Sequence, residues 1–343
     1  MAGSINLRRE VLTTEWLDPT SDFQPVQRRV EVRWDPLTGH ASRILSDVQL
    51  FKTSAFDLRA LAEQTRPECP FCGERIETAT PRLPSAIHPE GRIHRGTAVL
   101  FPNLVTYAQY SAVAVYGPDL HFLSLDQMTP RLVADNLAVQ VEFITRVMKH
   151  DPQARWASIN ANQMLPSGGS LFHPHMQAAV DRFPSTMQQR LSQVAAERFA
   201  EFLELEQREG ERYIGRTGNV HWLASFAPIG FEEIMAYIPE ISSPVALSSS
   251  HVEGLGIGLS RVLNLYAEMG HQSYNLACYG LLPGTGTPLM LRIVARSNPD
   301  TLYRSDAMYS ERLHWQAMVD TSPEELATRA RASFDSSRSG RDR

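Results

Sequence analysis

The stretch from residue 160 to residue 177 holds the densest group of side chains that could do chemistry. Its centre is the loop Ser167, Gly168, Gly169 and Ser170. Glycine adopts backbone dihedrals that other residues avoid, so such a loop can turn its N–H groups toward an anion. The serine hydroxyls and the amide of Asn162 add uncharged hydrogen-bond donors. This pattern predicts a cradle for a phosphate group.

Three polar side chains follow the loop at alternate positions, His173, His175 and Gln177. Alternate residues of a strand share a face, so these three are expected to line one wall of a cleft. Near neutral pH much of the imidazole is unprotonated. A histidine beside a phosphate can therefore act as a base, or attack phosphorus and hold the phosphoryl group as a phosphoramidate. The amide of Gln177 could donate to a phosphate oxygen. The residues leave both roles of histidine open.

The three cysteines point to metal binding and not to disulfides. Cys69 and Cys72 form a Cys-Pro-x-Cys pair, and Cys278 stands in an apolar stretch that is typical of a core strand. A tetrahedral zinc site needs two more ligands besides such a pair. A redox dithiol is the alternative, but no helix-forming run follows Cys72, which favours zinc. An odd, low cysteine count is typical of a reducing compartment, so we expect a cytoplasmic protein.

Composition excludes several classes of protein. The 343 residues carry 33 Lys and Arg against 38 Asp and Glu, a net charge of −5, so nothing suggests nucleic-acid binding. No apolar run approaches the roughly 20 residues that span a bilayer, and the N-terminus lacks a signal-peptide core. A globular protein of about two domains is expected, with no membrane and no nucleic acid among its partners.

The elements that must position these residues alternate between strands and helices. Val30, Val32 and Trp34 alternate before the turn Asp35–Gly39, which predicts a hairpin with the segment around Ile44. Further strands are expected at 97–100, 112–116, 156–160, 175–180, 221–226, 233–237, 274–280 and 289–295. Helices are expected after the cap Thr129-Pro130, over 185–209, over 252–269 and after Ser322-Pro323. Apart from this hairpin, the first sixty residues are expected to be irregular. Residues 64–96 are expected to form a loop that needs something other than a hydrophobic core to order it.

The order of these elements repeats. Strand, strand, long helix, strand, Leu-Pro loop and strand occur once around Leu165-Pro166 and again around Leu282-Pro283. Aligning the two pairs sets His175 opposite Arg292, so one half carries the polar chemistry. We expect an α+β fold of two similar halves, in which helices pack on antiparallel sheets. We expect residues 1–182 to form the half with the metal site and the catalytic motif. Residues 183–334 should form the half that binds the acceptor or the sugar of the substrate, and residues 335–343 a disordered tail.

Four sequence elements resemble the galactose-1-phosphate uridylyltransferase branch of the histidine-triad superfamily. They are the run from Asn162 through the Gly/Ser loop to His-Pro-His-x-Gln, the segment Arg66–Cys72, Phe101-Pro102-Asn103, and the stretch around His221-Trp222. The resemblance extends over about residues 25–330 and implies two tandem histidine-triad-like halves. It also implies a homodimer.

The activity implied by the resemblance is a ping-pong nucleotidyl transfer of the EC 2.7.7 class. His175 would attack the α-phosphate of a nucleoside diphosphate sugar and hold the nucleotide covalently until a phosphate-bearing acceptor takes it. Gln177, Ser170 and Asn162 would hold the phosphate oxygens, and Asn103 would touch the nucleotide. Fixed donors of this kind supply most of the catalysis in such reactions.

The resemblance also suggests the missing zinc ligands. They would be His121, which follows Pro118-Asp119 with one extra residue, and His173, which would complete one zinc per chain. His88 or His94 could replace His121. A zinc ion there would tie the loop around Cys69 to the strand of His175.

This sequence departs from the family at positions that recognise the sugar. Glu311 is shifted by one residue from the acidic hexose ligand, Met318 or Val319 replaces a glutamine, and Leu104 replaces an aspartate. Arg292-Ile293-Val294 stands where a second metal site would need histidines, so no second metal is expected. The acceptor therefore stays open. A sugar phosphate makes a transferase, inorganic phosphate a phosphorylase of a nucleotide sugar or dinucleoside polyphosphate, and water a hydrolase. A non-catalytic, zinc-stabilised nucleotide-binding protein is a further alternative.

Overall fold

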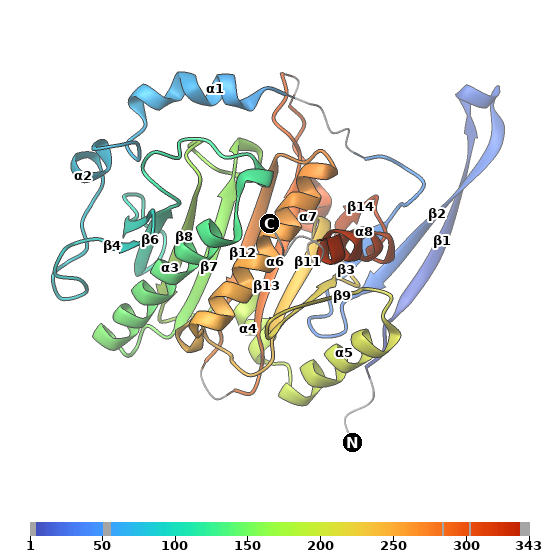
Figure 1. Cartoon of the computed structure of the whole chain (residues 1–343). Helices are drawn as coiled ribbons and strands as arrows, with labels where there is room; N and C mark the ends of the chain where they lie inside the picture. The colour runs from blue at the N-terminus through green and yellow to red at the C-terminus, as the bar shows by residue number, and fades with distance from the viewer. Residues whose placement is uncertain (1–4, 51–55, 283–284, 302, 337–343) are drawn as a thin grey trace.

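A computed structural model describes residues 5–50, 56–282, 285–301 and 303–336. Its main feature is an antiparallel sheet of ten strands among these residues (Figure 1). From edge to edge they are β4 (Ile93–Arg95), β5 (Ala98–Pro102), β6 (Tyr110–Val115), β8 (His175–Asp181), β7 (Trp156–Gln163), β12 (Ser273–Tyr279), β13 (Leu289–Arg296), β11 (Phe231–Ile238), β10 (Val220–Ala224) and β9 (Tyr213–Thr217). The eight strands predicted from the sequence for this sheet are confirmed, and β4 and β9 are additional.

The expected repeat is visible in the strand order. β5, β6, β8 and β7 run inward from one side, and β12, β13, β11 and β10 run outward in the mirrored order. The two sets meet where β7 pairs with β12, with Asn162 opposite Asn275. Because hydrogen bonds cross this seam, the two halves share one continuous sheet. The α+β fold with two similar halves is confirmed, while the boundary at residue 182 stays a prediction.

Two long helices, α3 (Pro130–His150) and α6 (Ser249–Glu268), lie side by side on one face of the sheet (Figure 1). Thr129 caps α3 as expected, since its hydroxyl accepts from the Leu132 N–H. The helices pack closely because a Cβ on Gly256 would lie 2.6 Å from the Pro130 carbonyl oxygen. The large core between helices and sheet contains Ile144, Ile159 and many other apolar side chains. This layer holds the central strands rigid.

The helix expected over residues 185–209 is in fact two helices, α4 (Thr186–Ser192) and α5 (Ala196–Glu209). The Gln188 amide of α4 donates to the carbonyls of Ala157 and Gly280, which fixes α4 against the sheet. The chain then turns at Ala195, whose ψ of 141° is extended, before α5 begins. The prediction of a single helix was therefore wrong.

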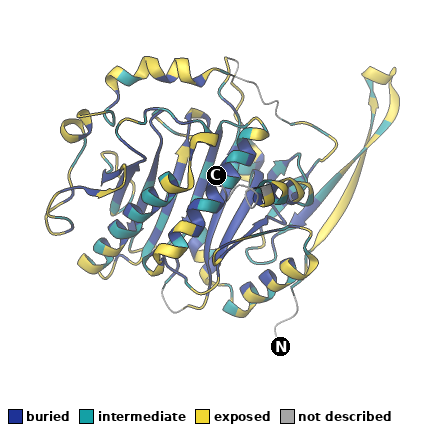
Figure 2. Ribbon diagram, viewed as in Figure 1, coloured by how far each residue is buried: buried dark blue, intermediate teal, exposed yellow. Residues whose placement is uncertain are grey.

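The N-terminal segment is more ordered than the sequence suggested. β1 (Arg9–Asp18) and β2 (Gln24–Trp34) form a long ribbon that projects from the body and is largely exposed (Figure 2). With β3 (Ala41–Ile44) and β14 (Ala317–Val319) they make a second sheet, ordered β1-β2-β3-β14. The predicted hairpin between β2 and β3 is confirmed by the pairing of Glu31 with Ile44. The expectation of irregular chain before it was wrong, because β1 forms through pairing and buries few of its own side chains.

The remaining helices are short or terminal. They are α1 (Leu58–Thr65), α2 (Arg75–Ala79), α7 (Tyr309–Leu313) and α8 (Pro323–Ser336), with 3-10 turns η1 (Pro19–Ser21), η2 (Arg66–Glu68), η3 (Leu125–Gln127), η4 (Leu165–Ser167) and η5 (Pro244–Ala246). The start of α8 after Ser322 is as predicted, and the helix runs into the expected tail, of which residues 337–343 lie outside the described residues. No helix that the structure describes has both the length and the apolar character needed to cross a membrane.

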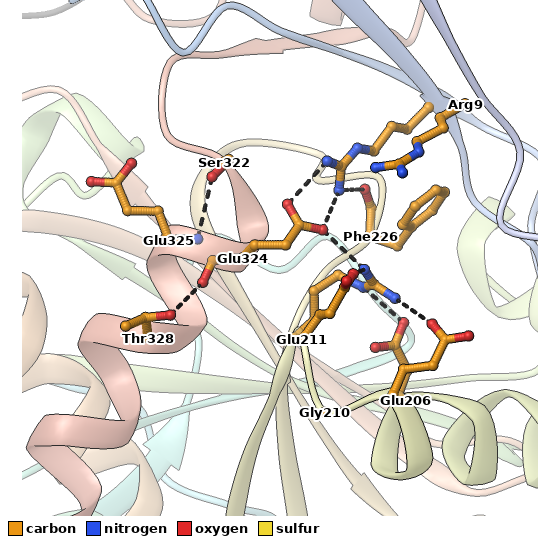
Figure 3. A network of polar contacts seen from close by, with 12 residues as sticks. Arg9, Glu206, Gly210, Glu211, Phe226, Ser322, Glu324, Glu325 and Thr328 are labelled. Carbon is orange, nitrogen blue, oxygen red and sulfur yellow. Dashed lines mark hydrogen bonds and ion pairs between the residues drawn. The ribbon is translucent and has the colours of Figure 1, made fainter.

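A network of buried charges fastens α8 to the second half of the sheet (Figure 3). Glu324 accepts two hydrogen bonds from Arg33 at 2.8 and 3.0 Å and a third from Arg212 at 2.9 Å. Both guanidinium groups also lie about 5 Å from the ring centroid of Phe226, at 5.0 and 5.1 Å. Arg212 reaches further to Glu206 on α5. Glu324 of α8 is thus joined to β2 and to the turn before β9, and Arg212 extends the network to α5.

Candidate active site and metal centre

The four predicted metal ligands lie together, although they come from three separate loops. The ligand atoms of Cys69, Cys72, His121 and His173 all lie within 4.8 Å of one another. The Nδ1 atom of His173 is 3.6 Å from the Cys69 sulfur and 3.4 Å from the Cys72 sulfur, and Nδ1 of His121 is 3.1 Å from the latter. In a tetrahedral zinc site sulfur and nitrogen ligands stand about 3.5 Å apart. The four donors therefore fit a metal ion, and His121 fills the place for which His88 and His94 were alternatives.

Backbone carbonyls orient both imidazoles toward the sulfurs. Nε2 of His121 donates to the Ala62 carbonyl at 2.9 Å, and Nε2 of His173 donates to the Gly117 carbonyl at 2.9 Å. Each ring therefore presents the lone pair of Nδ1 to the centre of the cluster. Such outer hydrogen bonds commonly set the tautomer of metal-bound histidines.

Burial explains why this cluster suits a cation. It lowers the pKa of His173 to about 3, so the ring stays neutral, as a ligand must be. Burial, together with the neighbouring Cys69, raises the pKa of Cys72 to about 12. A redox dithiol needs a lowered thiol pKa instead. A cation bound between the sulfurs would favour their thiolate form.

His175 begins β8, two residues after the cluster. Its Nδ1–H donates to the His173 carbonyl at 2.8 Å, so the ring carries its lone pair on Nε2. The ring is 7% exposed, and burial lowers its pKa, which keeps it unprotonated at neutral pH. Phe71, from the loop between the cysteines, meets the rings of both histidines edge-on, with centroids 5.7 and 5.6 Å away. The metal cluster and His175 thus form one packed unit.

Gln177 lies beside His175 on the same face of β8. Its Nε2 is 3.5 Å from Nε2 of His175, and its Oε1 accepts a 2.8 Å hydrogen bond from the Tyr107 hydroxyl. Tyr107 thereby turns the NH₂ end of the amide toward the histidine. Sequence reasoning missed Tyr107, because it stands in an irregular loop with no motif of its own. The loop follows Asn103, whose Oδ1 accepts from the Val105 N–H.

The Gly/Ser loop is built differently from the prediction. The N–H groups of Ser167, Gly168 and Gly169 donate to carbonyls of Met164 and Leu165 within η4, and the Ser167 hydroxyl donates to Gln163 and Met164. These donors are used inside the turn, so the expected cradle of N–H groups is not formed by residues 167–169. The glycines have a steric role. Gly168 has φ +92°, and a Cβ on Gly169 would lie 2.8 Å from a backbone oxygen. Ser170, which is exposed, remains a possible hydroxyl donor.

Asn162 lies on the same open face of the sheet as His175. In β7 the residues that point to the helices are buried, whereas Asn160 and Asn162 point to the opposite, accessible face. Asn160 pairs with Gln177, so Asn162 lies level with His175. Asn275 of β12 faces Asn162 across the seam and was also missed by sequence reasoning.

Glu311 lies further from this group, on the wall of a 210 Å³ pocket that also touches Asn275. Its carboxylate accepts from the N–H of Met308 at 2.9 Å, the hydroxyl of Ser310 at 2.8 Å and the N–H of Met318 at 3.2 Å. It therefore caps α7. Arg292 aligns with His175 when the sequences of the two halves are compared. It is buried and forms an ion pair with Glu233 at 2.5 Å.

Comparison with known proteins supports the fold. No family model matches the chain. An "Uncharacterized protein" of Archaeoglobus fulgidus is 31% identical over 314 residues, which cover 88% of this chain and 92% of that protein. An ADP-glucose phosphorylase from Arabidopsis thaliana, solved with ADP-glucose, superposes with a TM-score of 0.67 at 17% identity, over 88% of this chain and 98% of its own.

Two more structures agree. A GalT-like protein of the same plant has a TM-score of 0.65 at 18% identity over 88% of this chain and 98% of its own. A uridylyltransferase mutant has a TM-score of 0.64 at 18% identity over 89% of this chain and 98% of its own. The chain therefore belongs to one family with the archaeal protein, and it shares the fold of the ADP-glucose phosphorylase, the GalT-like protein and the uridylyltransferase.

Proposed function

We propose that the protein is a nucleotidyltransferase that works through a covalent nucleotidyl-His175. The observation that carries the proposal is the state of the His175 ring. Its Nδ1–H is held by the His173 carbonyl, so the lone pair lies on Nε2, and the NH₂ group of Gln177 contacts that nitrogen at 3.5 Å. A neutral, oriented imidazole beside uncharged donors is suited to attack phosphorus.

The reaction has two balanced steps. Nε2 of His175 attacks the α-phosphorus of a nucleoside diphosphate sugar, a P–N bond forms, and the bond to the bridging oxygen breaks, so that sugar 1-phosphate leaves. A phosphate oxygen of the acceptor then attacks the same phosphorus and the P–N bond breaks. Gln177, Asn162 and Ser170 hold the non-bridging oxygens, and Asn103 contacts the nucleotide. Ser167, Gly168 and Gly169 contribute by shaping the loop that carries Ser170.

Zinc is the metal that the donor set favours, one ion per chain on Cys69, Cys72, His121 and His173. Two thiolates and two imidazoles make a closed tetrahedral shell with no position for substrate, so its part is structural. It would hold the loop of Phe71 against the strand of His175. The ring of His175 then keeps its position both when it is free and when it carries the nucleotide.

The geometry of Glu311 favours a second candidate, a phosphorylase. Both oxygens of this carboxylate already accept hydrogen bonds from the α7 segment. Only one of its four acceptor positions is left for a sugar hydroxyl, whereas inorganic phosphate needs no such contact. A nucleotide-sugar or dinucleoside-polyphosphate phosphorylase that uses the same His175 is therefore the alternative to a transferase that takes a sugar phosphate.

A homodimer is also proposed. The pairing of β1 with β2 sets Leu12 opposite Val30 and Trp16 opposite Val26, which makes an apolar face on the projecting ribbon. Leu12 is 46% exposed. Two-stranded ribbons are only marginally stable alone, so we expect a second copy to cover this face. Sedimentation at micromolar concentration should show a dimer, and a monomer would contradict this part.

Covalent labelling tests the function. The protein is mixed with ADP-glucose or UDP-glucose labelled at the α-phosphate and then denatured at alkaline pH, where a phosphoramidate survives. Label should remain on the wild type and on His150→Ala, an exposed histidine of α3, and should be absent from His175→Ala. Adding glucose 1-phosphate, inorganic phosphate or buffer alone to the labelled enzyme then identifies the acceptor from the product. If no nucleotide leaves label on the wild type, the covalent mechanism is refuted and the alternative of a non-catalytic nucleotide-binding protein is left standing.

A further inference from the structure

Asn275 forms a polar link between the two halves of the sheet, directly beside the candidate active site. Its Nδ2 donates to Oδ1 of Asn162 at 2.6 Å and to the Ser167 carbonyl at 2.9 Å. One side chain from β12 therefore binds both Asn162, the residue of β7 proposed to hold the phosphate, and the turn that precedes Ser170. The side chain is half-buried on the accessible face of the sheet.

Arg296 fixes which way the Asn275 amide points. Its Nη1 donates to Oδ1 of Asn275, and a guanidinium has no acceptor, so the oxygen end must face it. Arg296 is in turn held by the buried Asp306, with Nε–Oδ2 at 2.7 Å and Nη2–Oδ1 at 2.5 Å. The charges of Arg296 and Asp306 cancel, so this pair orients Asn275 and does not itself present an anion site. The NH₂ end of Asn275 is left to face β7.

This arrangement determines the orientation of Asn162 as well. Because its Oδ1 accepts from Asn275, its own NH₂ group must point the other way. That Nδ2 atom lies 3.9 Å from the position a Cβ would take on Gly168, at the foot of the loop. Asn162 thus presents donors to the accessible face. With the opposite amide orientation it would present an oxygen, which repels a phosphate.

We propose that Asn275 is a positioning residue for nucleotidyl transfer. It orients the amide of Asn162 so that this amide donates to the α-phosphate, and Arg296 and Asp306 in turn orient the amide of Asn275. The proposal rests on the proposed function of His175. It makes the second half of the chain, in which Arg292 aligns with His175, a contributor to the chemistry of the first. The catalytic residue remains His175, and Asn275 acts only through Asn162 and the loop.

Two substitutions of Asn275 test this role, because their relative effects on the rate of adduct formation differ between positioning and packing. Asn275→Ala removes the donor and leaves Asn162 free to turn, which should slow formation of the covalent adduct about tenfold. Asn275→Asp keeps the shape but turns a donor into an acceptor. Asn162 must then donate to the new carboxylate and present its oxygen to the substrate. That should cost about 100-fold, in the range found for a lost oxyanion donor. A role limited to packing would spare the isosteric aspartate and penalise alanine.

A double-mutant cycle checks that the effect passes through Asn162. In an Asn162→Ala background, Asn275→Asp should slow adduct formation by less than about threefold, because interacting residues are not additive. Asn219→Ala, in the exposed turn between β9 and β10, is the matched control and should react at the wild-type rate. Wild-type rates for both Asn275 variants, or full additivity with Asn162→Ala, would overturn the proposal.

A second measurement is independent of activity. Hydrogen–deuterium exchange of residues 164–170 should be faster in Asn275→Ala and in Arg296→Met than in the wild type, while α3 exchanges unchanged. If the wild type forms no adduct with any nucleotide, the proposed function fails. The hydrogen–deuterium exchange of residues 164–170 then still tests whether Asn275 positions the loop. Protection of residues 164–170 that is the same in these variants as in the wild type would overturn it.

Discussion

The two halves of the large sheet hold the segments around them by opposite means. Around β8 the donors are two thiols and two imidazoles, which the proposed zinc ion would hold together. Around β10 and β11 the chain supplies its own cations, since Arg33 and Arg212 share the carboxylate of Glu324. The half with the metal cluster should therefore depend on an external ion, whereas the other half should depend on pH.

The largest effect is expected from breaking the metal cluster. Cys69→Ser should lower the zinc content from about one per chain to near zero and slow adduct formation at least about tenfold, because His173 then loses the contact that positions the next strand. Metal analysis of protein purified without added metal, together with the labelling assay, measures both. Cys278→Ala, a buried thiol of β12, is the control and should keep its metal. Stoichiometric zinc in Cys69→Ser would refute the cluster.

The second effect concerns the charge network. Glu324→Gln leaves two buried guanidinium groups without their shared carboxylate, so the free energy of unfolding should fall by about 3 kcal/mol. Zinc content should not change, because the network lies in the other half. Urea denaturation at pH 7 followed by metal analysis checks both statements. A variant as stable as the wild type would mean that the network contributes nothing.

The same network should give the protein a sensitivity to acid. Burial alone would raise the pKa of Glu324, but hydrogen bonds from Arg33 and Arg212 lower it to about 2, against an ordinary value of 4.5. The stability that this group contributes is therefore present above pH 4.5 and is lost as the pH falls toward 2. The melting temperatures of wild type and Glu324→Gln should converge over that range. A difference that stays constant down to pH 2 would contradict the assignment.

The smallest effect is expected at an exposed ion pair. Glu142 and Arg146 lie one turn apart on α3 with 42% and 39% of their side chains exposed. Glu142→Gln should change the free energy of unfolding by no more than about 0.5 kcal/mol. A loss as large as that of Glu324→Gln in the same urea titration would show that burial does not separate the two kinds of pair.

The sequence predicted what depends on local patterns. Alternation and capping located the main strands and α3, the Cys69 and Cys72 pair indicated half of a metal site, and the family resemblance suggested its two histidines. Contacts between distant positions were out of reach. Nothing in the sequence says that Tyr107 meets Gln177, or that Asn275 lies level with Asn162. The loop at Ser167 was misjudged because its composition suits an anion cradle, whereas the tight turn uses the same N–H groups internally.

The seam between β7 and β12 bears on the ancestry of the chain. A single half on its own would leave the edge of β7 bare, with unpaired N–H and C=O groups that invite another strand. Two identical halves could satisfy each other there by lying across a two-fold axis, and the mirrored strand order preserves that arrangement. Gene fusion would then have joined an ancestral pair into one polypeptide, after which one copy kept the nucleophile and the other was free to diverge.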